Sequence, residues 1–288
     1  MSCEKPFNNF QGTRRDALSV RLYNNGMRDP LSHKGDNGTV AIIGGSQFMH
    51  GAPIFSALAA EATGVDLVHV CLPALHATVA RTYSLNIQVH PFHGDELSRQ
   101  DRKEILALLA TMDCAVIGPG IGRDEQTLGC LKDIVAEGSS TMILDASALQ
   151  PWTLEIVSGK PVILTPHLGE LERMGIPPEE IGAYAKRFHV TIVAKGSTDR
   201  IALPDGTVCE IAGGNAGLTV GGTGDALAGI IAGLSAQGLS PLDACRAACT
   251  AIKRAGAVLY PEFGYAYGTE RVIKEIPGIL RSLDDVSL

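Results

Sequence analysis

A glycine-rich turn followed by an acid is the strongest chemical signal in the sequence. Residues 221–224 read Gly-Gly-Thr-Gly, and Asp225 follows as an apolar helical pattern begins. Glycines let successive backbone N–H groups point at one set of oxygens, and a helix N-terminus adds partial positive charge. Asp225 would take a proton from a hydroxyl that attacks a phosphoryl group, while Gly222, Thr223 and Gly224 stabilise the negative charge. The alternative is that Asp225 caps the helix.

A second candidate is the segment 195–199, Lys-Gly-Ser-Thr-Asp, which ends an apolar strand pattern. The ammonium of Lys195 suits a phosphate, and the backbone exposed at Gly196 offers further donors. The alternative is a solvated lysine at the end of a strand. The segment therefore adds a possible phosphate contact to the first candidate.

Two acids and a histidine follow other strand patterns. Asp145 comes directly after an apolar run, where a carboxylate either faces a ligand or caps a helix. His167 and Glu170 follow a Thr-Pro pair, and their spacing puts both side chains on the first turn of a helix. His167 would either hydrogen-bond a substrate or titrate near neutral pH, and the sequence does not decide between these.

Two more glycine loops follow apolar strand patterns. Residues 44–52 open onto a helical pattern near Pro53, and residues 118–122 contain three glycines. Both expose backbone where a strand ends, which suits either a bound anion or a plain tight turn. The first loop is neither a Walker A sequence nor a dinucleotide-binding fingerprint.

Short apolar strands alternate with helical patterns along the chain, which predicts a mostly parallel sheet with helices on both faces. The expected strands are 39–43, 66–71, 114–117, 141–144, 161–164 and 190–194, and the expected helices are 53–62, 99–110, 126–136, 179–188, 225–236 and 241–259. The segment 199–210 breaks the rhythm as a β-hairpin and belongs at an antiparallel edge. Ligands of such sheets collect at the C-terminal strand ends, where all the candidate loops lie.

Composition limits the partners and the compartment. The chain has 288 residues, 45% of them hydrophobic, and a net charge of -7, so neither a nucleic acid nor a membrane is expected as a partner. Seven scattered cysteines without a CxxC pair indicate reduced thiols, and the first residues lack a secretory signal, which together predict a cytoplasmic protein. One domain is expected over 26–288, after an N-terminal arm or helix over 1–25.

The motifs together resemble the ribokinase superfamily, and within it the nicotinamide nucleotide hydrate dehydratases. The superfamily's Gly-x-Gly-Asp motif matches residues 222–225. The features shared with the dehydratases run in family order through residues 34–38, 44–52, 118–122, 144–146, 164–170, 195–196 and 221–225. They cover about residues 34–233, and seven weak motifs in order form a specific pattern.

This resemblance implies a three-layer αβα sandwich and a kinase-like repair reaction. The enzymes of the family transfer a phosphoryl group from ADP or ATP to the hydroxyl of hydrated NADH or NADPH, and loss of phosphate restores the dihydronicotinamide, with AMP or ADP released. The implied site residues are Ala52, Gly120, Gly122, His167 and Asp225 for the hydrate, and Lys195, Gly196, Ser197, Thr198, Asp199 and Gly224 for the nucleotide. Glu170 is implied to organise Mg²⁺ through water.

Some expectations rest on positions where this sequence departs from the family pattern, and others on analogy with the family. Asp199 stands where many relatives carry Thr, and only about 25 residues precede the fold, so an epimerase activity is expected from another chain. ADP is the expected donor, and a homo-oligomer is the expected assembly. Two alternatives are a kinase of a vitamin-precursor alcohol, a thiazole or a pyrimidine, and a nucleotide sensor that needs no acid at position 225.

Overall fold

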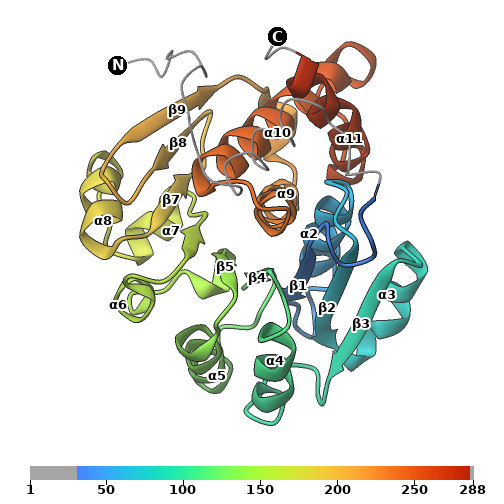
Figure 1. Ribbon diagram of the computed structural model, residues 1–288, viewed down its shortest axis with the longest axis vertical. Helices are drawn as coiled ribbons and strands as arrows, with labels where there is room; N and C mark the ends of the chain where they lie inside the picture. The colour runs from blue at the N-terminus through green and yellow to red at the C-terminus, as the bar shows by residue number, and fades with distance from the viewer. Residues whose placement is uncertain (1–30, 286–288) are drawn as a thin grey trace.

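The computed structural model describes residues 31–285, and the arm or helix expected over residues 1–25 lies outside them. A single nine-stranded sheet runs through the middle in the order β3-β2-β1-β4-β5-β6-β7-β8-β9 (Figure 1). The strands are β1 (Thr39–Ile43), β2 (Leu67–Pro73), β3 (Ile87–Phe92), β4 (Cys114–Ile117), β5 (Thr141–Leu144), β6 (Val162–Leu164), β7 (Thr191–Ala194), β8 (Thr198–Ala202) and β9 (Val208–Ala212).

The strands from β3 to β7 are parallel, and β8 and β9 form the antiparallel edge that the hairpin pattern predicts. The register levels the C-terminal ends of the central strands, since Ile117 pairs with both Ile43 and Leu144, and Leu144 also pairs with Leu164. The loops that follow these strands therefore start side by side along one edge of the sheet.

Helices cover both faces of the sheet, which confirms the expected three-layer fold (Figure 1). The first face carries α2 (Gly51–Glu61), α3 (Ala77–Tyr83), α9 (Thr223–Ala236), α10 (Pro241–Phe263) and α11 (Thr269–Asp285). The second carries α4 (Arg102–Leu109), α5 (Glu125–Glu137), α6 (Thr153–Val157), α7 (Leu168–Arg173) and α8 (Ile181–Phe188). Four 3₁₀ turns lie at Ala74–His76, Ala146–Ala148, Pro178–Glu180 and Ala216–Thr219.

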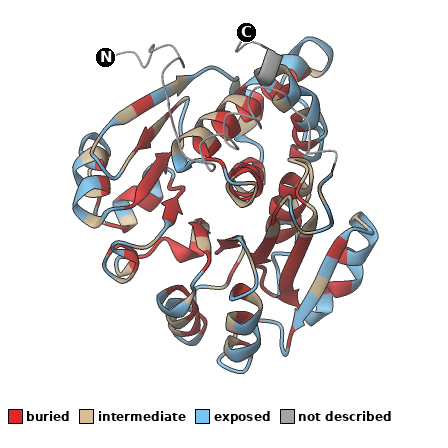
Figure 2. Ribbon diagram, viewed as in Figure 1, coloured by how far each residue is buried: buried red, intermediate tan, exposed pale blue. Residues whose placement is uncertain are grey.

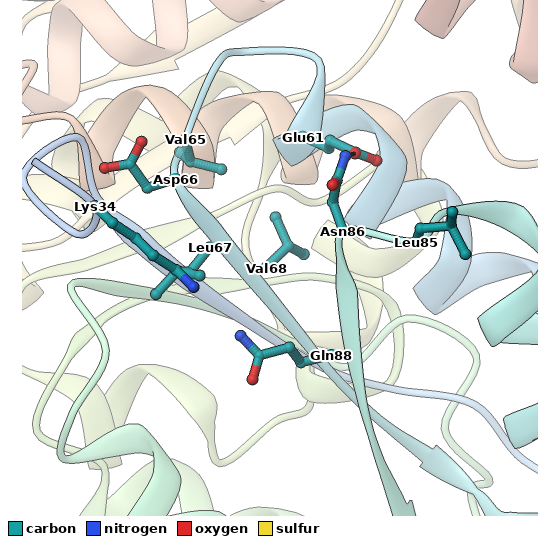
Figure 3. Close-up of a pocket in the computed structure, with 9 residues that line it drawn as sticks. All are labelled: Lys34, Glu61, Val65, Asp66, Leu67, Val68, Leu85, Asn86 and Gln88. Carbon is teal, nitrogen blue, oxygen red and sulfur yellow. Dashed lines mark hydrogen bonds between the residues drawn. The ribbon is translucent and has the colours of Figure 1, made fainter.

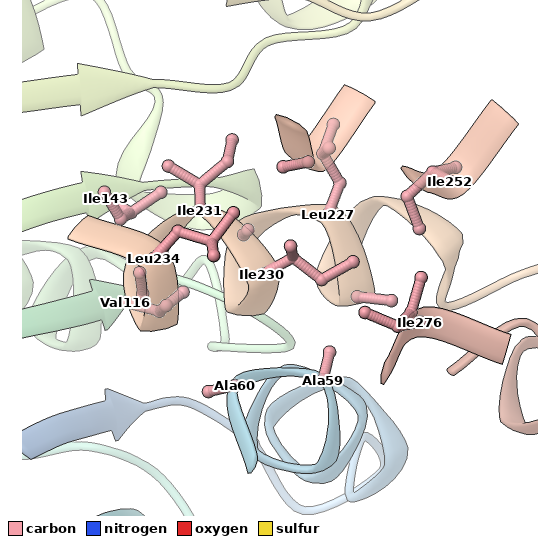
Figure 4. Packing of buried hydrophobic residues seen from close by; sticks show 14 of the residues in the cluster. Ala59, Ala60, Val116, Ile143, Leu227, Ile230, Ile231, Leu234, Ile252 and Ile276 are labelled. Atoms are coloured by element: carbon pink, nitrogen blue, oxygen red, sulfur yellow. The ribbon is translucent and has the colours of Figure 1, made fainter. Parts of the chain in front are cut away.

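The hydrophobic core is deepest around α9, which is buried along most of its length (Figure 2). Its apolar side chains meet the sheet, α2, α10 and α11 (Figure 4). Two glycines let α2 approach closely, because a Cβ on Gly229 would collide with the backbone of Ser56, and one on Gly233 would collide with Thr63. The hydroxyl of Ser56 donates to the carbonyl of Asp225 at 2.9 Å, so this packing fixes the first turn of α9.

Strand β3 and the helices α3, α6 and α11 were not predicted from the sequence. Strand β3 is the parallel edge strand, and its Gln88, His90 and Pro91 interrupt the apolar run that marks a buried strand. Helix α3 is one of the shortest helices, and its Val79 and Tyr83 are exposed, so it lacks the repeated apolar face of a longer helix.

Two features of residues 31–285 concern the environment of the protein: the apolarity of the helices and the state of the cysteines. Between residues 31 and 285 no helix combines the length and the apolarity needed to cross a bilayer. The cysteines in this range are buried and free: Cys71, Cys114, Cys130, Cys209, Cys245 and Cys249. Burial raises the pKa of the Cys71 thiol to about 12, which makes it an inert core residue.

Candidate active site

The C-terminal edge of the sheet gathers the loops that the sequence singled out. Gly44, Gly118, Asp145, Thr165 and Lys195 each follow the last residue of a parallel strand. Helices α2 and α9 both begin at this edge, so the positive ends of their dipoles face the same region (Figure 1). The edge therefore favours a ligand that carries negative charge.

A lysine and two buried carboxylates form the centre of this edge. The Nζ of Lys195 lies 2.6 Å from an oxygen of Asp145 and 3.8 Å from an oxygen of Glu170. The hydroxyl of Thr165 donates to Asp145 at 2.9 Å. Burial alone would lower the pKa of Lys195, but the two carboxylates outweigh it and raise this pKa, so the lysine stays charged.

Asp225 is the third residue of α9, three positions after the N-cap Gly222. It is therefore not the N-cap that the capping alternative required. Burial raises the pKa of Asp225 to about 7, repulsion from Asp145 and Glu170 adds to the rise, and Lys195 opposes it. A carboxylate with a pKa near neutrality can accept a proton and release it again at physiological pH.

The glycine turn before Asp225 is held by its neighbours. Gly222 has φ +98°, which favours glycine, and a Cβ there would lie 2.5 Å from the ring of Phe55. The hydroxyl of Thr269 donates to the carbonyl of Gly221 at 2.9 Å, and that of Thr223 donates to Val220 at 3.1 Å. The backbone N–H of Thr223 donates to the same Val220 carbonyl at 3.4 Å, so both the side chain and the backbone of Thr223 help to hold the turn.

Lys195 lies against the same turn. A Cβ built on Gly224 would lie 3.2 Å from the Nζ of Lys195, so a larger residue would crowd the ammonium. The structure thus brings Lys195, Gly224 and Asp225 together, although 29 residues separate Lys195 from Gly224 in the chain. The ammonium of Lys195, the backbone of Gly224 and the carboxylate of Asp225 therefore lie side by side.

His167 and Glu170 form a capping box at the start of α7. The Nδ1 of His167 accepts from the backbone of Gly169 and Glu170, while Glu170 accepts from the backbone of His167 at 2.9 Å. Because Nδ1 accepts, we assign the neutral ring with its proton on Nε2. The His167 side chain is 56% exposed, and its Nε2 lies 3.4 Å from a carboxylate oxygen of Glu170.

The two loops after β1 and β4 touch each other. A Cβ on Gly120 would lie 3.2 Å from the Cβ atoms of Ala52 and Met49, so the predicted substrate residues Ala52 and Gly120 are neighbours. Gly122 lies against the carboxylate of Glu96, whose other oxygen accepts from the backbone of Gln47 at 3.1 Å. Sequence reasoning missed Glu96, which lies in a polar stretch with no motif.

The loop after β7 is exposed at Gly196 and Ser197, as a nucleotide-binding loop requires. Asp199 instead turns inward, where one carboxylate oxygen accepts from the backbone of Gly196 at 2.9 Å and the other lies 3.2 Å from the Nζ of Lys253. Lys253 was also missed, because it lies inside the apolar pattern of α10.

Other described parts of the molecule are weaker candidates for a functional site. Within residues 31–285 no three His, Cys, Asp or Glu side chains converge as a metal-binding group. A depression of about 600 Å³ lies at the opposite edge of the sheet, where β2 and β3 begin (Figure 3). Its lining includes Glu61 and Gln88, which belong to no predicted motif, and Lys34, which begins the shared segment 34–38.

Comparison with known proteins agrees with this geometry. The fold and the glycine-acid turn define a ribokinase-like α/β protein. A sequence profile described as NAD(P)H-hydrate dehydratase matches residues 40–278. The chain belongs to this NAD(P)H-hydrate dehydratase family, which confirms the resemblance seen in its motifs.

Individual relatives support the assignment. An ADP-dependent (S)-NAD(P)H-hydrate dehydratase from Nitrosopumilus maritimus is 35% identical over 271 residues, which cover 90% of this chain and 94% of the relative. A bifunctional NAD(P)H-hydrate repair enzyme from Methanopyrus kandleri is 32% identical over 272 residues, 88% of this chain and 52% of its own length. The crystal structure of an ADP/ATP-dependent NAD(P)H-hydrate dehydratase from Bacillus subtilis, co-crystallised with ATP and Mg²⁺, superposes with a TM-score of 0.78 at 25% identity, covering 98% of this chain and all of that one.

Proposed function

We propose that the chain is a nucleotide-dependent lyase that dehydrates the S epimer of hydrated NADH or NADPH and so repairs the cofactor. The observation that carries this proposal is the position of Asp225, with its pKa near 7, beside the glycine turn and Lys195 at the edge where the family motifs meet. Family membership supplies the substrate, and the geometry supplies groups suited to moving a phosphoryl group.

The proposed reaction has two steps. Asp225 takes the proton of the substrate hydroxyl, whose oxygen attacks the terminal phosphoryl group of ADP or ATP; a phosphorus–oxygen bond forms, and the bond to the departing AMP or ADP breaks. The carbon–oxygen bond of the phosphorylated hydrate then breaks with loss of a proton from the neighbouring carbon, which releases phosphate and restores the ring double bond. Phosphorylation makes the departing oxygen a good leaving group.

Each part of the edge has a role in this scheme. The amides of Gly222, Thr223 and Gly224 at the N-terminus of α9 stabilise the charge of the transferred group. Lys195 and the loop that follows it, exposed at Gly196 and Ser197, bind the nucleotide phosphates. Ala52, Gly120, Gly122 and the exposed side chain of His167 form the side that receives the hydrate.

Magnesium enters the proposal with the nucleotide. Mg²⁺ supplies charge neutralisation on the phosphates, and it is usually held by one or two carboxylates, water and the phosphates rather than by a protein cage. This fits a site where residues 31–285 contain no three-ligand cluster. Glu170 already accepts from its own capping box, so a contact with the ion would run through water.

The test mixes the purified protein with hydrated NADH or NADPH and either ADP or ATP. We expect the dihydronicotinamide absorbance to return with stoichiometric phosphate, and more rapidly with ADP. No return with either nucleotide would exclude a dehydratase. A stable phosphorylated product from a thiazole or pyrimidine alcohol would instead identify a vitamin-precursor kinase, and nucleotide binding without any turnover would identify a sensor.

Three wider expectations belong to the same proposal. A separate epimerase would convert the R epimer of the hydrate, because dehydration of one epimer alone would leave the other. The six free, buried thiols support a reducing compartment, for which the cytoplasm is our proposal. A homo-oligomer stays a prediction, and light scattering is the measurement for it.

A further inference from the structure

A buried ion pair lies directly behind the proposed nucleotide loop. The Nζ of Lys253 in α10 lies 3.2 Å from Asp199, and both side chains are less than 10% exposed. Cys249, one turn earlier in α10, hydrogen-bonds the same carboxylate. The pair thus joins α10, on the first face of the sheet, to β8, the strand that follows the loop.

Lys253 also holds the loop through its backbone. Its ammonium donates to the carbonyls of Gly196 at 3.2 Å and Ser197 at 2.9 Å. Asp199 closes the loop from the other side by accepting from the N–H of Gly196. The ammonium therefore lies within 3.2 Å of three oxygen atoms, and its two hydrogen bonds fix the direction of the carbonyl groups of residues 196–197.

The aliphatic stem of Lys253 reaches a second functional segment. Cβ atoms built on Gly213 and Gly214 would lie 3.7 Å and 3.5 Å from its carbon atoms. These glycines begin the segment that leads to the turn at 221–224. One further contact ties this segment to α10, since Asn215 donates to the carbonyl of Gly256 at 2.7 Å. Lys253 thus lies where the nucleotide loop and the segment leading to the catalytic turn meet.

Stability alone gives a weak reason for this arrangement. A buried ion pair roughly offsets its own desolvation cost, and a matched apolar pair is often equally stable or more so. What an apolar pair cannot supply is a set of directed hydrogen bonds to two successive carbonyls. The contribution of the pair is therefore the shape of the loop.

We infer that Lys253 and Asp199 are positioning residues that set the affinity for the adenine nucleotide, by holding the carbonyls of residues 196–197 and the N–H of Gly196 so that the loop keeps the shape that meets the phosphates. This inference rests on the proposed function for the identity of the ligand. It assigns Asp199 a role through the loop rather than a direct contact with the nucleotide.

The experiment compares Lys253→Met and the double variant Lys253→Met/Asp199→Asn with the wild-type full-length protein. We expect the KM for ADP, and its Kd measured by calorimetry without hydrate, to rise about tenfold in both variants, in line with the loss of charged hydrogen bonds. The KM for the hydrate should stay within about twofold. The double variant should melt at a higher temperature than Lys253→Met, because it leaves no unpaired buried charge.

Lys274→Met is the matched control, because it removes a lysine from an exposed ion pair with Glu270 in α11. It should leave the Kd for ADP unchanged. The inference is overturned if the folded double variant binds ADP within about twofold of the wild type, or if the KM values for nucleotide and hydrate rise together. If Lys253→Met does not fold, the double variant decides alone. A wild type that binds neither ADP nor ATP would refute the proposed function instead, so the two failures are distinguishable.

Discussion

Replacing Asp225 with asparagine is expected to stabilise the protein while it abolishes catalysis. The pKa of Asp225 lies at about 7 in the folded protein, against 3.8 for an ordinary aspartate. Between these values the folded protein binds more protons than the unfolded chain, so this group makes stability fall as the pH rises from about 4 to 7. A difference of roughly three pH units corresponds to about 4 kcal/mol at pH 8, and partial solvent access reduces it toward about 1 kcal/mol.

Urea unfolding at pH 5 and pH 8 measures this effect. Asp225→Asn should exceed the wild type in free energy of unfolding by about 1–4 kcal/mol at pH 8, and the advantage should shrink at pH 5. Asp243→Asn is the matched control, since Asp243 holds the same third position in α10, but its carboxylate accepts from the hydroxyl of the exposed N-cap Ser240 at 2.6 Å. That variant should lose about 0.3–1 kcal/mol.

Activity gives the other half of the prediction. Only ionised Asp225 can accept the hydroxyl proton, so kcat/KM of the wild type should fall about tenfold per pH unit below about pH 7. Asp225→Asn should lose about 100-fold or more in kcat at every pH. The reasoning is refuted if Asp225→Asn is no more stable than the wild type at pH 8, or if it keeps its activity.

Two further predictions concern other parts of the fold. Lys195→Met leaves the buried Asp145 unpaired and should cost about 3–5 kcal/mol in urea unfolding, most of which Asp145→Asn should restore; a loss below about 1 kcal/mol would contradict the ion pair. Gly229→Ala should destabilise by at least about 2 kcal/mol, because the added Cβ meets the backbone of Ser56, whereas Gly278→Ala, with open space around it, should stabilise by up to about 1 kcal/mol. Equal melting temperatures for these two glycine variants would rule out the close approach of α2 and α9.

The buried centre of the fold was predictable because its local pattern is unambiguous. Strands β1, β4 and β5 match the expected bounds, since a parallel strand covered on both faces is a short continuous apolar run. Edge strand β3 was not predicted from the sequence, because its exposed face carries polar residues. Helix α9 begins two residues before the expected start, at Thr223, because the left-handed Gly222 already ends the turn.

The loops of the candidate site were predictable from the sequence, but the residues that hold these loops in place were not. Strand-end position predicted Lys195 and His167 at one edge, and the glycine turn at the start of a helix predicted Asp225; the structure brings them together there, although their roles stay predictions. The partners Glu96 and Lys253 had no sequence signal, because a contact such as Lys253 to Gly196 spans 57 residues and depends on how layers pack. For the same reason the raised pKa of Asp225 could not be predicted from the sequence, since it comes from burial and from the carboxylates of Asp145 and Glu170, which are distant in the chain.

The central claim, that the nucleotide phosphorylates the hydroxyl of the hydrate before water is lost, is tested most directly by following that oxygen. The hydrate is prepared with ¹⁸O in its hydroxyl group and converted by the wild-type protein with unlabelled ADP. If Asp225 activates this hydroxyl for attack on the phosphoryl group, the ¹⁸O appears in the released phosphate. Recovery of the ¹⁸O in water, with unlabelled phosphate, would contradict phosphoryl transfer at this site.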